Sequence, residues 1–293
     1  DEMGRAIHEL AVPEREALKL AYQRWQELGE HLVATQERTT EQFSTLPLPT
    51  GPGHANLGAA HSRVVYIAPC PVLEEGAVNA GRDWGQLQTQ YLSMHRGITF
   101  MDDFLKPAAA EALLAFAQES TIWHDVKNGY LGSYQQDGFS SPLFLQVAHE
   151  LRELLPDILK DHELTQAWGY KYPKNNAGIK IHADAAAVNV NFWLVPDACN
   201  LQPGTGGLVV YGLEADSSMS FAEFNLQPRK FYVEKMTMRG VEKTVIPYRA
   251  NRVVIFHSNL YHETASFNFK EEYKCYRINF TFLFGRRASD SNR

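Results

Sequence analysis

The chain of 293 residues has few cysteines: Cys70, Cys199 and Cys275, with no Cys-x-x-Cys pair. An odd number of widely spaced cysteines is typical of reduced thiols rather than of a disulfide framework. We therefore expect a reducing, cytoplasmic location. The same shortage excludes a zinc site built from cysteine thiolates.

Long apolar runs and clusters of basic residues are also lacking. No stretch approaches the ~20 apolar residues needed to span a bilayer, and we recognise no signal peptide, so we expect no membrane association. The formal net charge is −6, from 28 Lys and Arg against 34 Asp and Glu. A nucleic-acid-binding surface normally carries a basic stripe, so we expect no nucleic-acid partner.

The residues that are present divide the chain into three predicted segments. Residues 1–45 carry apolar side chains at helical spacing, and Glu9 to Leu32 resembles one tetratricopeptide-type helix pair. We predict a helical N-terminal extension there, with a surface for a protein partner. Residues 46–95 begin with a stretch rich in Pro and Gly and are predicted to be a linker and irregular segment. Residues 96–288 are predicted to form the main domain.

The main domain is predicted to be mainly β with flanking helices, an α+β arrangement. A strand is expected over 98–104 and helices over 107–119 and 142–155, each helix with Pro in its first turn. From Gln166 onward apolar residues alternate with a period of two. The candidate strands are 166–172, 178–184, 186–195, 207–212, 230–235, 244–248, 252–257 and 273–284. Short strands in this number predict a β-sandwich or jelly roll with helices packed on one sheet.

A metal site is indicated by the sequence His182-Ala183-Asp184 at the end of a candidate strand. In a strand, residues i and i+2 face the same side, so the imidazole and the carboxylate converge. The third ligand is either His257 or His262, and we favour His262 because a turn after strand 252–257 can direct its side chain back. Two histidines and one carboxylate form the arrangement used for Fe(II), with positions left open for a cosubstrate and O₂.

The last candidate strand places Arg277 on its inner face, together with Cys275, Asn279 and Thr281. A buried Arg is costly unless it is paired, and its guanidinium matches a carboxylate through two hydrogen bonds. Arg277 is thus predicted to anchor a dicarboxylate cosubstrate, or else to form a structural salt bridge with an internal acidic residue. The pair Arg286-Arg287, just after this strand, is expected to be a solvated tail.

Further inward-facing polar residues come from neighbouring strands. Asn189, Asn191 and Trp193 share one face of strand 186–195. Asn189 and Asn191 are predicted either to bond to the cosubstrate carboxylate or to serve as structural hydrogen-bonding residues. Tyr170 and Tyr172 also share one face, and Tyr170 is our candidate to complete a carboxylate clamp, although one of the two is expected to be an ordinary core tyrosine.

In this order the motifs resemble the prolyl-hydroxylase-like branch of the 2-oxoglutarate/Fe(II)-dependent dioxygenases, over roughly residues 96–286. The matching stretches are ITFMDDFLKP from Ile98, Tyr170-Lys-Tyr with Gly178 to Asp184, Gly206-Gly207-Leu, Arg252 to Ser258 with His262-Glu263, and Arg277-Ile-Asn-Phe. The resemblance implies a double-stranded β-helix (jelly-roll or cupin-like) core that uses Fe(II), 2-oxoglutarate and O₂. It also implies iron ligands at His182, Asp184 and His262 and a cosubstrate anchor at Arg277.

Two departures from that family bear on the substrate. The anchor is Arg where many prolyl hydroxylases use Lys, so a prolyl substrate is not implied. The stretch between the ligands carries a polar insertion near 213–229, where substrate specificity would be determined.

The activity implied is hydroxylation of a C–H bond in a peptide side chain or small molecule, with release of succinate and CO₂. Asp184 supports hydroxylation, because the related halogenases replace this carboxylate with a small residue. Two alternatives are a catalytically silent β-barrel used for binding or sensing, and a cupin-type metal dioxygenase that uses no 2-oxoglutarate. Arg277 discriminates against the latter, because an enzyme without the cosubstrate does not need it.

Overall fold

The computed structural model describes Gln23, Val64 and residues 66–93, 97–127, 129–173, 178–216 and 218–287. Apart from Gln23, the predicted helical extension over residues 1–45 and its protein-docking surface lie outside the described residues. No helix in the described part of the chain has the length and apolar character that crossing a bilayer requires.

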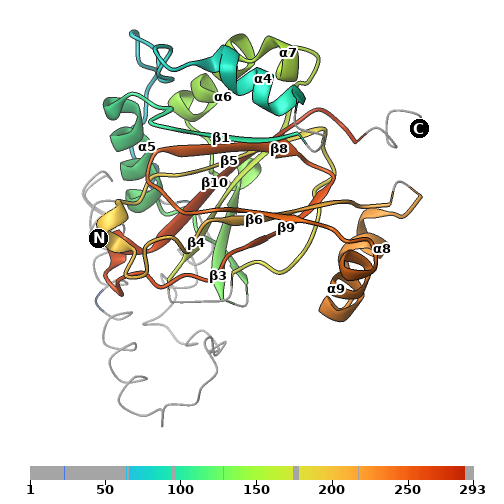
Figure 1. Cartoon of the computed structure of the whole chain (residues 1–293). Helices are drawn as coiled ribbons and strands as arrows, with labels where there is room; N and C mark the ends of the chain where they lie inside the picture. The colour runs from blue at the N-terminus through green and yellow to red at the C-terminus, as the bar shows by residue number, and fades with distance from the viewer. Residues whose placement is uncertain are drawn as a thin grey trace.

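Two antiparallel sheets form the body of the protein (Figure 1). The large sheet has seven strands in the order β1-β8-β5-β10-β4-β3-β2. Its strands are β1 (Ile98–Asp102), β2 (Asp125–Lys127), β3 (Tyr130–Tyr134), β4 (Leu164–Tyr172), β5 (Val188–Trp193), β8 (Arg252–His257) and β10 (Arg277–Phe284). The small sheet has the order β7-β6-β9, from β6 (Leu208–Glu214), β7 (Lys243–Ile246) and β9 (Leu260–Thr264). This is the mainly β class predicted from the sequence, and it is consistent with a jelly roll.

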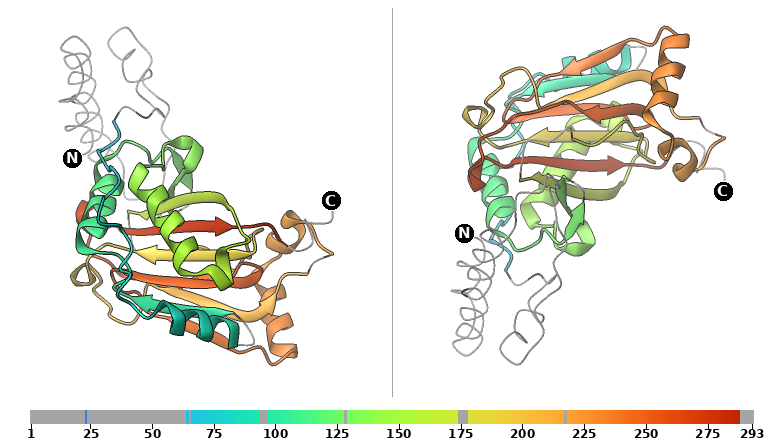
Figure 2. Two further views of the ribbon diagram at one scale, coloured as in Figure 1. Left: turned by 90° about the horizontal axis from the view of Figure 1, so that it is seen from above. Right: turned by 90° about the horizontal axis from the view of Figure 1, so that it is seen from below.

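Helices cover the face of the large sheet that lies away from the small sheet (Figures 1 and 2). They are α4 (Trp84–Ser93), α5 (Pro107–Glu119), α6 (Pro142–Leu154) and α7 (Pro156–Leu159). Helix α6 begins where predicted, because the Ser141 side chain accepts a hydrogen bond from the Phe144 amide at 3.1 Å. Phe144 packs on Phe282 of β10 with ring centroids 4.4 Å apart. The alternating apolar face of β10 is therefore the face that the helices bury.

Several predicted elements differ from the structure. Residues 230–235, expected to be a strand, lie in helix α9 (Arg229–Met238), which follows the short helix α8 (Phe221–Asn225). Tyr232 and Met236, four residues apart, are its buried side chains, a spacing that fits a helix. Residues 178–184 form no strand, and β10 begins only at Arg277, after a 3₁₀ turn over Tyr273–Cys275. Short 3₁₀ turns also occur at Gln135–Asp137 and Asp197–Cys199.

The segment predicted to be irregular contains helix α4, whose Trp84 and Leu87 are buried. Only two buried side chains in ten residues give a weak periodic pattern, which explains why this helix was not predicted. Strands β2, β3 and β9 were also not predicted. They have three, five and five residues, too few for alternation to be distinctive.

The expectation of reduced cysteines is wrong for two of the three. Cys199 and Cys275 form a disulfide across 76 residues of sequence, while Cys70 is free and buried. The fold places the end of the turn after β5 beside the start of β10, and sequence spacing gives no sign of that. The cysteine count therefore no longer supports a cytoplasmic location.

Candidate metal centre and adjoining cavity

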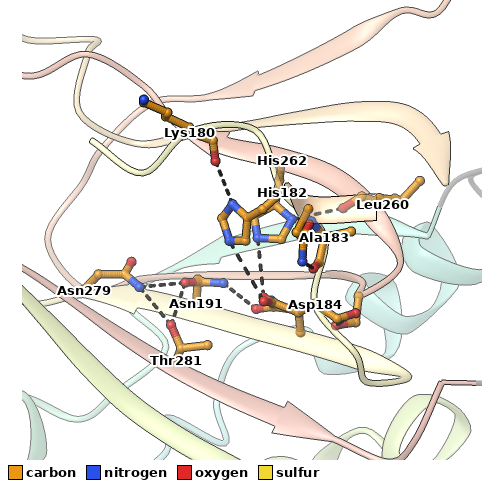
Figure 3. A network of polar contacts seen from close by, with 12 residues as sticks. Lys180, His182, Ala183, Asp184, Asn191, Leu260, His262, Asn279 and Thr281 are labelled. Carbon is orange, nitrogen blue, oxygen red and sulfur yellow. Dashed lines mark hydrogen bonds and ion pairs between the residues drawn. The ribbon is translucent and has the colours of Figure 1, made fainter. Parts of the chain in front are cut away.

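Three predicted ligands, His182, Asp184 and His262, converge where the segment before β5 meets β9. One donor atom from each lies within 4.8 Å of the others. The Nε2 atom of His262 is 3.5 Å from Asp184 Oδ2, and that of His182 is 3.9 Å from Asp184 Oδ1. In Figure 3 the two imidazoles lie side by side and both face the carboxylate.

Backbone pairing holds the ligands together. His182 and His262 oppose each other in an isolated antiparallel bridge, in which each amide donates to the other carbonyl, at 3.0 and 2.8 Å. The Asp184 amide donates to the Ser258 carbonyl at 3.1 Å. The convergence of residues i and i+2 thus occurs as predicted, although the segment pairs with β9 through a bridge and is not a full strand.

The protonation states suit metal binding. The Nδ1 atoms of His182 and His262 lie 2.8 and 3.0 Å from the carbonyl oxygens of Lys180 and Leu260, so Nδ1–H donates to the backbone and each Nε2 atom is directed toward Asp184. Burial, together with the nearby His262, lowers the pKa of His182 to about 4. Burial alone would raise the pKa of Asp184, but the contacts from His262 and His182 outweigh it and lower that pKa. At neutral pH the site therefore has a neutral His182 and an ionised carboxylate.

His257, the other candidate ligand, lies away from this group. Its half-buried ring ends β8, with Nδ1 3.9 Å from Glu214 Oε1. The structure thus brings His262, and not His257, next to Asp184.

A chain of neutral polar side chains extends from Asp184 across β5 and β10. Asn189 Nδ2 donates to Asp184 Oδ2 at 2.6 Å, and Asn191 donates to Asn189. Asn279 Nδ2 donates to Asn191 Oδ1 at 2.8 Å and to Thr281 Oγ1 at 2.9 Å (Figure 3). The predicted inward faces of both strands are therefore correct. Asn189, predicted near the cosubstrate, is bonded to Asp184 itself.

Arg277 is a buried cation without a carboxylate partner among the described residues. Its side chain is 1% exposed, Nε donates to the Gly206 carbonyl at 2.7 Å, and Nη1 has no hydrogen-bond partner. Aromatic rings surround its Cζ at 5.1–6.0 Å: Tyr172, Phe267, Trp193 and Tyr248. Burial lowers the pKa of Arg277. The predicted alternative of an internal salt bridge is not realised in the described structure, and one donor is left to receive an anion.

A cavity of about 500 Å³ opens beside the triad. His182, Asp184 and His262 line it, as do Tyr170 and Asn191. Arg277 is not itself part of the wall, but its neighbours are: Tyr172, and Asn279 two residues along β10. Burial, with the neighbouring Tyr134, raises the pKa of Tyr170, so its hydroxyl stays protonated at neutral pH.

The polar insertion and helix α9, which follows it, pack against the segments that carry the triad. Phe224 of the insertion forms a small core with Tyr232 and Met236 of α9 and with Ile181, Ala183 and Tyr261, which adjoin the three ligands in sequence. The contact is reinforced by Asn225, whose Nδ2 donates to the Ala183 carbonyl and whose Oδ1 accepts from the Ala183 amide, both at 2.9 Å. Nothing in the sequence beyond the polar character of the insertion pointed to Asn225.

Two arginines fix the insertion to the rest of the domain. Arg229 donates to Glu263, the residue after the ligand His262, at 2.5 and 3.1 Å. Arg287, 5% exposed, donates to the carbonyls of Ala215 and Asp216 at 2.9 and 2.7 Å. The expectation that Arg287 is a solvated tail is therefore wrong, because the turn after β10 directs it under the insertion.

No protein-family model matches the chain, and no curated protein matches it. Solved structures similar to it include 2-oxoglutarate-dependent non-haem oxygenases. The epimerase SnoN from nogalamycin biosynthesis is 14% identical, over 70% of this chain and 86% of SnoN, with a TM-score of 0.49. A Pseudomonas putida prolyl-4-hydroxylase is 16% identical, over 70% of this chain and all (100%) of that one, with a TM-score of 0.44. HygX from Streptomyces hygroscopicus, with nickel, 2-oxoglutarate and hygromycin B bound, is 13% identical over 67% of this chain and 86% of HygX, with a TM-score of 0.46.

Proposed function

We propose that the chain is an Fe(II)- and 2-oxoglutarate-dependent oxygenase. The observation that carries the proposal is the combination of two features, one in the wall of the cavity and one directly behind that wall. One is a triad of two histidines and a carboxylate, and the other is a buried arginine with an unpartnered donor. The first suits Fe(II) with open coordination positions, and the second suits a cosubstrate carboxylate.

The triad residues would hold the metal through the Nε2 atoms of His182 and His262 and a carboxylate oxygen of Asp184. The hydrogen bonds on both Nδ1 atoms fix the rings in the binding tautomer, and Asn189 holds the carboxylate from the far side at 2.6 Å. When bound, iron supplies O₂ activation coupled to oxidative decarboxylation of 2-oxoglutarate.

Arg277 would bind the far carboxylate of 2-oxoglutarate through Nη1. A buried cation favours an anion strongly because little water screens the pair. Tyr170 and Asn191 line the same cavity and are proposed as further hydrogen-bonding residues for the cosubstrate.

The reaction proposed is hydroxylation of a C–H bond in a small molecule or peptide side chain. One oxygen atom of O₂ enters the product alcohol and the other enters succinate, with release of CO₂. Asp184 occupies the carboxylate position of the triad, which favours hydroxylation. We also propose that residues 96–288 form the oxygenase domain, preceded by the extension over 1–45 and the segment 46–95.

Succinate formation tests this function. Purified protein with Fe(II), O₂ and labelled 2-oxoglutarate should release labelled succinate, even without substrate at a slow uncoupled rate. Asp184→Ala should release none, while Asp216→Ala, which changes an exposed carboxylate, should match the wild type. Equal succinate from wild type and Asp184→Ala would remove the triad from the reaction and favour a silent barrel or a metal enzyme without 2-oxoglutarate.

A further inference from the structure

The cavity beside the triad is walled by aromatic rings. Its aromatic lining residues are Tyr130, Tyr134, Trp168, Tyr170, Tyr172 and Phe221. The first five come from β3 and β4, which are neighbours in the large sheet and direct every second side chain to the same face. Phe221 comes from the start of α8 in the insertion and is 55% exposed. Rings from two parts of the chain thus enclose the space in front of the metal ligands.

The same wall carries almost no charge. Among the described residues that line the cavity, Asp184 is the only carboxylate, and none is Lys, Arg or Glu. The nearby charges of β2 are not in the wall and neutralise each other, since Lys127 Nζ lies 2.9 Å from Asp125 Oδ2. Once the triad holds a metal, no charged side chain among the described wall residues remains to bind a charged substrate.

Three neutral polar residues of the wall, Asn191, Asn279 and Thr281, are already bonded to one another. Asn279 Oδ1 accepts from Trp193 Nε1 at 2.8 Å, and its Nδ2 donates to Asn191 and Thr281. Thr281 Oγ1 donates to Asn191 Oδ1 at 3.0 Å. The hydrogen bonds among these three residues use most of their donors and acceptors, so contact with the ring faces is a large part of the binding energy that the wall offers.

The tyrosine rings of the wall pack against one another at large interplanar angles. Tyr130 meets Tyr170 edge to face, with centroids 4.9 Å apart and an interplanar angle of 70°, and Tyr134 meets Tyr170 at 6.3 Å and 86°. Gly132 lies between the two β3 tyrosines, and a Cβ there would come within 3.4 Å of the Tyr170 ring. Ring positions fixed by mutual packing reduce the entropy lost when a ligand binds.

We propose that the substrate of this site is an uncharged molecule with a flat, unsaturated ring system. It would lie against the rings of β3 and β4 and under Phe221, with the carbon to be oxidised toward the triad. The cavity of about 500 Å³ is of the size that takes such a molecule. The oxidation rests on the proposed function, whereas the binding rests on the wall alone.

Three probes of one shape and different charge test the proposal. They are N-methyl-2-quinolone (neutral), N-methylquinolinium (cationic) and 2-naphthoate (anionic), each titrated by calorimetry into the full chain with Zn(II) and 2-oxoglutarate present. The expected result is that the neutral probe binds at least about tenfold more tightly than either ion. Aromatic cages also take cations, so tighter binding of the quinolinium would overturn the proposal, as would tighter binding of the naphthoate.

Substitutions locate the bound probe. Phe221→Ala should weaken binding of the neutral probe about two- to tenfold, the value of one aromatic contact. Leu226→Ala is the matched control, because Leu226 directly follows the same helix, is 81% exposed and does not line the cavity. Trp168→Leu, on the opposite wall, gives a second test that does not depend on the insertion. If Leu226→Ala weakened binding of the neutral probe as much as Phe221→Ala does, the probe would bind elsewhere and the proposal would be wrong. The same would follow if neither Phe221→Ala nor Trp168→Leu weakened binding.

The two proposals fail separately. The oxygenase reaction is read from succinate release, and probe binding is read from the heat of titration, also in metal-free protein. Succinate release without preference for the neutral probe would leave the oxygenase and overturn the substrate class. Tight binding of the neutral probe without succinate release would keep the aromatic site and overturn the oxygenase.

Discussion

The side chain of Asn225 makes two hydrogen bonds, both 2.9 Å long, with the backbone of Ala183. Ala183 is the residue between the ligands His182 and Asp184. The insertion thus binds the ligand segment at its central residue, although Asn225 and Ala183 are 42 residues apart in sequence.

We expect Asn225→Ala to weaken metal binding. The substitution removes both hydrogen bonds to the Ala183 peptide groups. Residues that hydrogen-bond to a metal-ligand segment typically contribute ten- to a hundredfold to the metal affinity, so we expect the affinity to fall about tenfold. Anaerobic titration with Co(II) measures it. Gln227→Ala is the control, since Gln227 bonds to Glu223 within the insertion and not to the ligand segment. Unchanged affinity in Asn225→Ala would show that the insertion does not position the ligands.

Two single substitutions, one at each candidate histidine, show which of them is the third metal ligand. His262→Ala should abolish stoichiometric Co(II) binding, because it removes one of three donors. His257→Ala should leave the affinity within about twofold, because this ring lies beside Glu214 and surface contacts of this kind contribute little. Calorimetric titration of both variants decides between them, and the reverse pattern would move the third ligand to His257.

Acid should destabilise the protein partly through Asp102 of β1. Arg252 Nε donates to Asp102 Oδ1 at 2.5 Å, and this contact is the main cause of the lowered pKa of Asp102. A carboxyl with a lowered folded-state pKa stabilises the fold above its unfolded value, and that stability is lost as pH falls through the folded value.

The variant Asp102→Asn should therefore lose about 1.5–3 kcal/mol of unfolding free energy at pH 7, the range for hydrogen bonds to charged groups. Denaturant melts at pH 7 and pH 3 measure the difference, which should shrink at pH 3. A difference that stays constant with pH would mean that the charge of Asp102 does not stabilise the fold.

Reduction of the Cys199–Cys275 disulfide should lower the stability of the domain. The bond closes 76 residues of chain, and a crosslink of this kind contributes about 2–4 kcal/mol. We expect a reductant to lower the melting temperature of the wild type and of Cys70→Ala, while leaving Cys199→Ser unchanged. Melts insensitive to reductant would show that the two thiols are not bonded in solution.

Local signals in the sequence predicted the parts of the site that depend on nearby residues. Helix α6 was predicted because Ser141 and Pro142 mark its start, and the ligand pair because His182 and Asp184 are two residues apart. The inward face of β10 followed from strict alternation around Arg277. Each of these features is decided within a few residues of chain.

Features decided by distant parts of the chain were not predictable. Helix α9 was mistaken for a strand, since its buried Tyr232 and Met236 pack on residues beside the ligands that the sequence does not show as neighbours. The Asn225 contact and the disulfide join segments 42 and 76 residues apart. A partner at that distance leaves no periodic pattern, so only the folded chain reveals it.

The most direct test of the account is anaerobic titration of the protein with Fe(II) and then 2-oxoglutarate, followed by visible absorption. We predict a weak charge-transfer band from the metal–cosubstrate chelate in the wild type. In Arg277→Ala the iron should still bind, but the 2-oxoglutarate concentration at half-maximal absorbance should rise at least about thirtyfold, the loss of about 2 kcal/mol expected for a buried charge pair. Iron binding without any band, or a band with the same midpoint in Arg277→Ala, would contradict the assignment of this site to 2-oxoglutarate.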